Sequence, residues 1–250
     1  MSAIELVLIR HGESVGNVAR EEAEGANAEK IVMSVRDPDV PLSPVGKEQA
    51  QALGRWFASL PADARPDNAW CSPYVRAQTT ARLTLAEVAD APPLRQDERL
   101  RDRELGILDL LTSTGVRNRF PEEAERRRWL GKLYYRPPGG ESWSDVALRI
   151  RSFLAELEAR PAALSGSGRH LIVAHDAVIL LFRYVCERLD EKALFELALA
   201  GSIRNASVTR IVRDGPDGAW RTTVHNDASH LERFGSRPTE HPGDVDAIHR

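Results

Sequence analysis

Two histidines each follow a run of apolar residues that has the length of a β-strand. His11 and the preceding Arg10 come directly after the run Leu6–Ile9, and His175 ends the run Leu171–Ala174. Short apolar runs of this kind are typical of strands buried in a sheet. If the two strands are parallel neighbours, both histidines lie at the edge where open α/β sheets bind ligands. An imidazole there can act as a nucleophile or a base, although Arg10 and His11 alone could also form a surface turn without function.

A third segment adds a second arginine. Ser72 is a suitable N-cap and Pro73 suits the first position of a helix, so Arg76 is expected in the first turns of that helix. Arg10 can bind an oxyanion through two parallel N–H donors. Two arginines, two histidines and the positive end of a helix together favour a dianionic phosphate as the ligand.

This ordered set of motifs resembles the histidine phosphatase superfamily, which includes cofactor-dependent phosphoglycerate mutases and fructose-2,6-bisphosphatases. The resemblance runs from about Ile4 to about Leu231, and Pro138–Ser142 and His175–Val178 are most similar to the bisphosphatase branch and related plain phosphatases. It implies an α/β fold, a three-layer αβα sandwich around a mostly parallel sheet, as in phosphoglycerate mutases. The residues that carry it are Arg10, His11, Gly12, Glu13, Ser14, Asn17, Ser72, Pro73, Arg76, Ala77, Thr80 and His175.

The resemblance also implies a mechanism in which His11 takes the phosphoryl group and water hydrolyses the phosphohistidine. Arg10 and Arg76 disfavour the imidazolium form of His11 and stabilise charge on the transferring group. Because cations and a helix dipole supply this charge, we expect no metal and no cofactor. The expected substrate and phosphate ligands are Arg10, Ser14, Asn17, Arg76, Arg136, His175 and Asp176.

The leaving alkoxide needs a proton from a carboxylic acid. The family motif has an acid four residues before a glycine, and counting back from Gly106 gives Asp102. Most relatives have Glu at this position, so Asp102 is one methylene shorter than expected. Glu104 is the alternative acid if the loop is shifted, and one of the two carboxylates is expected to pair with Arg101 or Arg103.

Departures from the family patterns bear on the substrate. Arg136 matches a substrate-binding arginine of bisphosphatase-like members, but Gly139 replaces their lysine and no kinase domain is present. Arg103–Leu105 does not match the Arg-His-Tyr of the mutases, and Asp176 replaces their glycine, which is expected to restrict the substrates. We expect a metal-independent phosphatase for a small phosphomonoester, with a phosphoglycerate mutase or a catalytically weak, phosphate-binding regulatory protein as alternatives. A metal hydrolase ranks last, because its ligand spacing matches no standard pattern.

Composition limits the class of protein and its partners. The chain has 250 residues, of which 42% are hydrophobic, enough for one sizeable core. A net charge of −3 provides no electrostatic attraction for nucleic acid or an acidic membrane. Cys71 and Cys186 form no metal motif or disulfide framework, and no signal peptide or membrane-spanning run is visible. We expect a cytoplasmic protein whose partner is a small phosphorylated metabolite, with a homodimer left open.

A single domain must position these residues. We expect a histidine phosphatase domain over residues 1–235, with a cleft-capping helical insertion at about 107–141 and a disordered tail over 236–250. Ser142 and Asp145 have the form of a capping box for the helix that follows. The other predicted elements are helices at Val18–Glu24 with Asn17 as cap, from Ser43-Pro44, from Pro73 to about Asp90, at Thr112–Lys132 and at Val178–Leu189, and strands at Asn68–Cys71, near Leu94, at Asn205–Val212 and at Trp220–His225.

Overall fold

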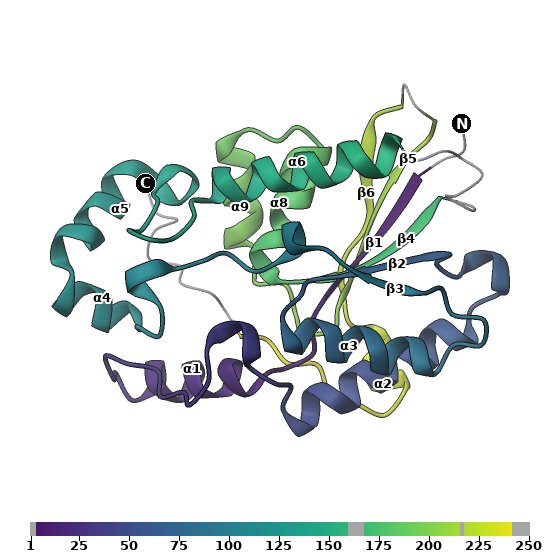
Figure 1. Cartoon of the computed structure of the whole chain (residues 1–250), viewed down its shortest axis with the longest axis horizontal. Helices are drawn as coiled ribbons and strands as arrows, with labels where there is room; N and C mark the ends of the chain where they lie inside the picture. The colour runs from purple at the N-terminus through teal and green to yellow at the C-terminus, as the bar shows by residue number, and fades with distance from the viewer. Residues whose placement is uncertain (1–3, 160–167, 216–217, 242–250) are drawn as a thin grey trace.

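A six-stranded sheet in the order β3-β2-β4-β1-β5-β6 forms the centre of the molecule (Figure 1). The computed structural model describes residues 4–159, 168–215 and 218–241. Strands β1 to β4 are parallel, whereas β5 and β6 are antiparallel additions, so the predicted α/β class with a mostly parallel sheet is confirmed. The strands are β1 (Ile4–Arg10), β2 (Asn68–Cys71), β3 (Leu94–Gln96), β4 (Arg169–Ala174), β5 (Val208–Arg213) and β6 (Trp220–Asp227).

Strands β1 and β4 are parallel neighbours, as the two histidine motifs required. In their register Arg10 faces Ala174, and the backbone N–H of His11 donates to the Ala174 carbonyl at 3.0 Å. Both strands are covered on both faces, which explains why each is apolar without alternation. The residues that follow them therefore meet at one edge of the sheet.

Helices cover both faces of the sheet, which gives the three predicted layers. In Figure 1, α6 (Trp143–Ala159), α8 (Asp176–Cys186) and α9 (Glu191–Leu199) lie above the sheet, and α2 (Pro44–Ser59) and α3 (Val75–Ala86) lie below it. Alternate residues of β1 belong to the two cores: Leu6 and Leu8 to the upper one, Val7 and Ile9 to the lower one. No helix in the described ranges is long and apolar enough to cross a membrane.

Two of the predicted helix starts are confirmed. Ser43 accepts a hydrogen bond from the Gly46 N–H and precedes Pro44 at the start of α2. At the start of α6, Ser142 Oγ accepts from the Asp145 N–H at 3.1 Å, and Asp145 Oδ2 accepts from the Ser142 N–H at 2.8 Å. The capping box therefore forms with Asp in place of Glu.

Two other helix starts differ from the prediction. Helix α1 (Val15–Gly25) is capped by Ser14, and the Asn17 side-chain oxygen accepts a hydrogen bond from the Ser14 N–H. Helix α3 begins at Val75, and no side chain caps it. The prediction that Ser72 caps this helix is wrong, because its hydroxyl group is engaged elsewhere, in the site described below.

The expected insertion lies at one end of the sheet, on the left of Figure 1. It contains η4 (Gly106–Leu108), α4 (Ser113–Arg119) and α5 (Pro121–Tyr134). The single helix predicted for Thr112–Lys132 is broken at Phe120, which leaves the helical conformation (φ −135°, ψ 59°) before Pro121, because the proline ring disfavours a helical residue in front of it. The remaining short elements are η1 (Asp37–Asp39), η2 (Ala62–Ala64), η3 (Glu98–Leu100) and α10 (Ser229–Arg233).

The C-terminal residues 236–241 fold back onto the domain. Gln49 Nε2 donates to Thr239 Oγ1 at 2.9 Å, and the Asn205 N–H donates to the Thr239 carbonyl at 3.0 Å. The predicted disordered tail is therefore wrong for 236–241, whose polar groups find partners far away in the chain. Residues 242–250 lie outside the described part of the chain.

Candidate active site

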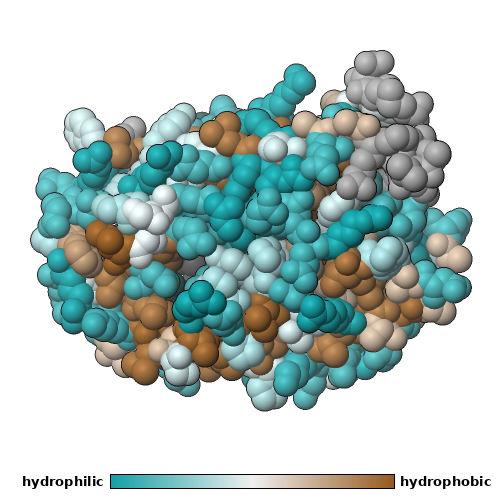
Figure 2. Space-filling view, in the orientation of Figure 1, coloured by the Kyte–Doolittle hydropathy of each residue, from teal (hydrophilic) through white to brown (hydrophobic). Residues whose placement is uncertain are grey.

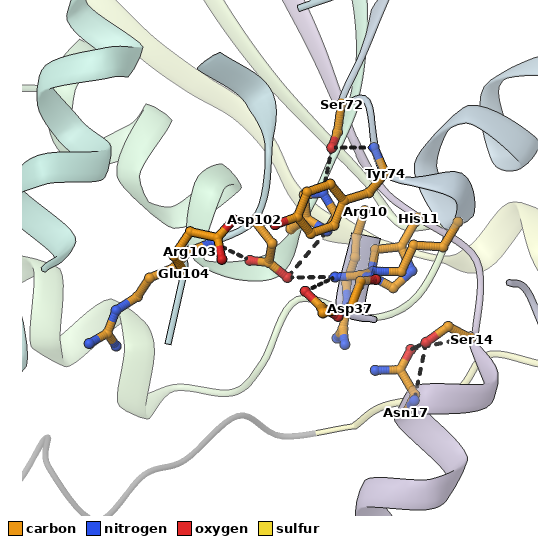
Figure 3. Close-up of polar contacts among 12 residues, drawn as sticks. Arg10, His11, Ser14, Asn17, Asp37, Ser72, Tyr74, Asp102, Arg103 and Glu104 are labelled. Atoms are coloured by element: carbon orange, nitrogen blue, oxygen red, sulfur yellow. Dashed lines mark hydrogen bonds and ion pairs between the residues drawn. The ribbon is translucent and has the colours of Figure 1, made fainter. Parts of the chain in front are cut away.

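A cavity of about 370 Å³ opens at the ends of β1 and β4. His11 lines this cavity, and His175, which does not line it, lies directly beside His11, with the two ring centroids 5.2 Å apart. Residues far apart in the sequence thus meet at the sheet edge, as Figure 3 shows. The predicted site residues that line the cavity are Arg10, His11, Ser14, Asn17, Arg76, Asp102, Glu104 and Asp176.

His11 is held as a neutral imidazole with one nitrogen free. Its Nδ1 lies 2.7 Å from the Gly12 carbonyl oxygen, which can only accept, so Nδ1 carries the proton and Nε2 keeps its lone pair. Burial, followed by the charges of Arg76, His175 and Arg10, lowers the pKa of His11 well below its usual value. The ring is therefore neutral at pH 7 and presents a nucleophilic nitrogen.

The turn after His11 is fixed by its neighbours. The Gly12 N–H donates to Thr80 Oγ1 at 3.0 Å, and the Glu13 N–H donates to Gln49 Oε1 at 2.8 Å. A Cβ atom at Gly12 would lie 2.4 Å from the Gly46 carbonyl oxygen, so only glycine fits this close approach. The turn thus holds the His11 backbone rigidly against α2 and α3.

His175 is fully buried, and both of its ring nitrogens have defined neighbours. Nε2 lies 2.8 Å from Ser72 Oγ, and that oxygen already accepts from the Tyr74 N–H at 3.2 Å. The Ser72 hydroxyl proton can therefore point to Nε2, which leaves Nδ1–H facing Asp102 Oδ2 at 3.3 Å. Burial, and then the charges of three arginines including Arg76, lower the pKa of His175 well below its usual value.

Arg76 is a buried guanidinium held between two carboxylates. Its Nη1 donates to Asp37 Oδ1 at 2.9 Å, and its Nη2 donates to Asp102 Oδ2 at 3.1 Å. Burial raises the pKa of Asp37, and the adjacent Arg76 opposes this shift. The two ion pairs fix the planar group beside His11 and His175, where it can bind an anion.

Arg10 is also buried but is held mainly by backbone oxygens. Its Nη1 donates to the Ile203 carbonyl, its Nη2 lies 3.5 Å from the His241 carbonyl, and its Nε has no hydrogen-bond partner among the described residues. Asp176, whose pKa is raised by burial, accepts from the Ile203 N–H at 3.2 Å. Arg10 thus keeps donor capacity for an anion in the cavity.

The structure separates the two candidate acids. Asp102 Oδ2 contacts both Arg76 and His175, so it lies among the groups that would surround a phosphate. Glu104 lines the same cavity but has a different partner, since its Oε1 accepts the Tyr74 O–H at 2.7 Å. This bond and, above all, burial raise the pKa of Tyr74.

Arg101 and Arg103, the arginines beside these acids, both bind Glu141. Arg101 pairs with Glu141 at 2.5 Å, and Arg103 Nε donates to the Glu141 carbonyl at 2.7 Å. Glu141 also pairs with Arg149 at 3.1 Å. Glu141 thus anchors the loop that carries Asp102 and is occupied in doing so.

Asn17 lines the cavity through its amide group. Its Oδ1 accepts from the Ser14 N–H at 3.1 Å and from Asn205 Nδ2 at 3.3 Å, so its Nδ2 is the group available to donate to a ligand. Asn205 also donates to the His11 carbonyl at 3.1 Å. The sequence analysis missed Asn205, because an isolated Asn before β5 carries no recognisable pattern.

Arg136 is not brought to the site, contrary to the prediction. Its guanidinium is ion-paired with Asp145 in the first turn of α6, and its side chain is 63% exposed and does not line the cavity. The hydrogen bonds from Arg136 lower the pKa of Asp145 to about 2. A carboxylate nine residues away in the sequence therefore holds this arginine at the surface.

The C-terminal segment also reaches the site. His241 Nε2 lies 3.1 Å from Glu13 Oε2, and His241 Nδ1 lies 3.0 Å from Glu21 Oε2. Glu240 lines the cavity and accepts from Ser202 Oγ at 3.1 Å. The sequence analysis assigned no role to His241, because the composition of its surroundings resembles a disordered tail. Among the described residues, no group of three or more His, Cys, Asp or Glu could hold a metal ion.

Known proteins are similar to this chain over much of its length. A relative from Gloeobacter violaceus, a 2,3-bisphosphoglycerate-dependent phosphoglycerate mutase, is 36% identical over 60% of this chain and 62% of its own length. A mutase of the same description from Methylorubrum populi is 31% identical over 79% of this chain and 86% of its own length. The solved structure of a mycobacterial glucosyl-3-phosphoglycerate phosphatase is 27% identical and covers 90% of this chain and 99% of its own, with a TM-score of 0.69.

The relatives include both mutases and phosphatases, so they agree on a superfamily rather than on one reaction. The model of the histidine phosphatase superfamily, branch 1, matches residues 6–228, from β1 to the start of α10. The chain therefore belongs to the histidine phosphatase superfamily.

Proposed function

We propose that this protein is a phosphatase that hydrolyses a small phosphomonoester through a phosphohistidine on His11. The observation that carries the proposal is the hydrogen bond from His11 Nδ1 to the Gly12 carbonyl oxygen at 2.7 Å. It leaves Nε2 unprotonated, and the lowered pKa keeps the ring neutral at the pH of most cells. A neutral Nε2 can attack phosphorus without first losing a proton.

In the first step the bond between His11 Nε2 and phosphorus forms while the bond from phosphorus to the leaving oxygen breaks. Arg10 and Arg76 stabilise the negative charge on the three phosphoryl oxygens. His175 Nδ1–H and Asn17 Nδ2 are additional neutral donors. Because two guanidinium groups supply the positive charge, we propose that the reaction needs no metal ion.

Asp102 supplies the proton that the leaving oxygen takes. Its position at 3.1 Å from Arg76 and 3.3 Å from His175 supports this role over Glu104, which is engaged with Tyr74. In the second step the Asp102 carboxylate takes a proton from water, and the hydroxide attacks phosphorus. The nitrogen–phosphorus bond breaks, which releases phosphate and restores neutral His11.

A phosphoglycerate mutase is the second candidate, because the relatives from Gloeobacter violaceus and Methylorubrum populi carry that name. Both reactions would begin on His11. They differ in whether water or a phosphoglycerate accepts the phosphoryl group from the histidine.

The test uses p-nitrophenyl phosphate with the wild-type enzyme, His11→Ala and the control His225→Ala, whose histidine lies on β6 outside the cavity. We expect turnover in the wild type and the control, with chelator present, and none in His11→Ala. Labelled substrate should leave acid-labile phosphate on His11. Full activity in His11→Ala would refute the mechanism, and efficient conversion of 3- to 2-phosphoglycerate after addition of 2,3-bisphosphoglycerate would favour the mutase.

A further inference from the structure

The cavity has an apolar wall beyond its charged end. Aliphatic side chains from two distant segments, 31–40 and 105–116, line it together with side chains from α6, α8 and α9. Figure 2 shows hydrophobic side chains among the hydrophilic ones over the region of α1, α4 and α5. The apolar wall consists of Ile31, Met33, Val40, Leu105, Leu108, Leu110, Leu111, Val116, Trp143, Leu180 and Leu199.

The apolar wall lies where a leaving group would extend. Asp102 lies at the charged end, Leu105 comes three positions later in the chain, and both residues line the cavity. A leaving oxygen beside Asp102 therefore has its carbon skeleton next to the leucines of the insertion. The volume of about 370 Å³ is in the range of sites that enclose a small organic ligand.

The apolar wall is built before any ligand arrives. The Ile31 N–H donates to the Leu110 carbonyl at 2.9 Å, and the Thr112 N–H donates to the Glu29 carbonyl at 3.2 Å. A Cβ atom at Gly115 would lie 1.9 Å from the Glu29 carbonyl oxygen, so the two segments approach as closely as their backbones allow. A preformed apolar surface binds apolar groups without an ordering cost.

Leu110 lies in this apolar wall with a strained backbone. Its φ angle is +56°, a left-handed conformation that is unfavourable for leucine and better suited to asparagine or glycine. Such strain persists where the surrounding structure enforces it and is concentrated at ligand sites. A large apolar side chain thus occupies a position that the backbone alone would assign to another residue.

We propose that the leaving group of the substrate is an apolar alkyl or aryl group of at least six carbons, bound against the apolar wall. The inference rests on the proposed phosphatase function and names its substrate class. The competing arrangement is a leaving group with a second anion, held by the basic residues Arg20, Arg103, Arg127 and Lys132 that also line the cavity.

The first experiment measures binding of phosphonates, which resist hydrolysis, by titration calorimetry. Hexylphosphonate should bind more tightly than methylphosphonate, by up to about fourfold for each methylene that is fully buried. Its binding should also show the more negative heat-capacity change that apolar burial produces. Equal affinities, or tighter binding of 2-carboxyethylphosphonate than of hexylphosphonate, would overturn the proposal.

The second experiment uses a matched pair of variants. Leu110→Asn removes an apolar side chain while suiting the positive φ angle, so the fold should be retained. Ile107→Asn is the control, because Ile107 lies three residues before Leu110, in η4, is 45% exposed and does not line the cavity. We expect Leu110→Asn to weaken hexylphosphonate binding by about tenfold and methylphosphonate binding by less than about twofold, with no effect of the control. Equal effects of the two variants would contradict the proposal.

Turnover separates this inference from the proposed function. Hexyl phosphate should be hydrolysed with a kcat/KM at least about tenfold above that of glycerol 3-phosphate. If glycerol 3-phosphate is hydrolysed equally well, the protein is a phosphatase and the substrate class is wrong. If neither ester is hydrolysed but hexylphosphonate still binds more tightly, the phosphatase function is wrong and the apolar specificity is upheld.

Discussion

Replacement of Asp102 by Asn tests the assignment of the general acid. The change preserves shape and removes the proton that the leaving oxygen needs. An alkyl alkoxide requires protonation far more than an activated aryl leaving group does. We therefore expect Asp102→Asn to reduce turnover of an alkyl phosphate by roughly 10²–10⁴-fold and that of p-nitrophenyl phosphate much less.

The structure predicts that this loss appears in kcat. Arg76 keeps its bonds to Asp37 at 2.7 and 2.9 Å when Asp102 is replaced, so the phosphate site stays assembled. The Asn side chain is neutral, as Asp102 is when it carries the proton for the leaving oxygen, so the site should bind a phosphate dianion about as well as before. KM should therefore not rise in Asp102→Asn.

Glu104→Gln is the comparison variant. A Gln side chain keeps an oxygen that can accept the Tyr74 O–H, which is the contact Glu104 makes at 2.7 Å. We expect a mild loss that is similar for both substrate types. Asp109→Asn is the matched control, since Asp109 lines the same cavity, and its Oδ1 accepts from the Leu110 N–H, a bond that Asn preserves.

The assay compares kcat for the two esters across pH in all four proteins. The alkaline limb of the pH–rate profile reports the acid and should vanish in Asp102→Asn only. A selective loss in Glu104→Gln with none in Asp102→Asn would show that Glu104 is the acid. A loss in neither variant would refute both assignments and leave Asp176 as the next carboxylate to test.

Three further predictions follow from the contacts. Because burial lowers the pKa values of His11 and His175, the unfolded chain binds protons that the native state does not. The free energy of unfolding should therefore fall as pH drops below about 6.5, by up to about 1.4 kcal/mol per pH unit for each histidine. Urea titrations at several pH values should show that this free energy depends less steeply on pH in His175→Ala than in the wild type. Arg136→Ala should leave kcat/KM within about twofold, because this side chain lies outside the cavity; a tenfold loss would show that it moves to the substrate. Thr239→Val removes the hydroxyl group that is hydrogen-bonded to Gln49 and Asn205, so kcat should fall by about tenfold with little change in the free energy of unfolding. An unchanged kcat would show that residues 236–241 do not position the His11 loop.

Local sequence determined the strands that end at the two histidines and several of the helix starts. A strand covered on both faces must be apolar throughout, so Leu6–Ile9 and Leu171–Ala174 are recognisable without knowledge of their neighbours. A capping box is equally local, because its two partners, Ser142 and Asp145, are three residues apart. Together with the order of the motifs, these features were sufficient to predict the family and its fold.

Tertiary structure decided the contacts between distant residues. Ser72 has the chemistry of an N-cap, but its hydroxyl group pairs with His175, which lies 103 residues away. Thr239 lies in a segment whose composition resembles a disordered tail, yet its hydroxyl group accepts from Gln49, 190 residues away. In both cases a long-range hydrogen bond replaces the structure that the local sequence favours.

The identity of the acid was decided in the same way. Asp102 and Glu104 are two residues apart, and a shift of the loop in either direction is compatible with the sequence. Only the folded chain brings Arg76 and His175 to Asp102 and Tyr74 to Glu104. Hydrogen bonds and ion pairs of this kind depend on burial and on partners from other elements. The spacing of residues within a single loop does not reveal either of them.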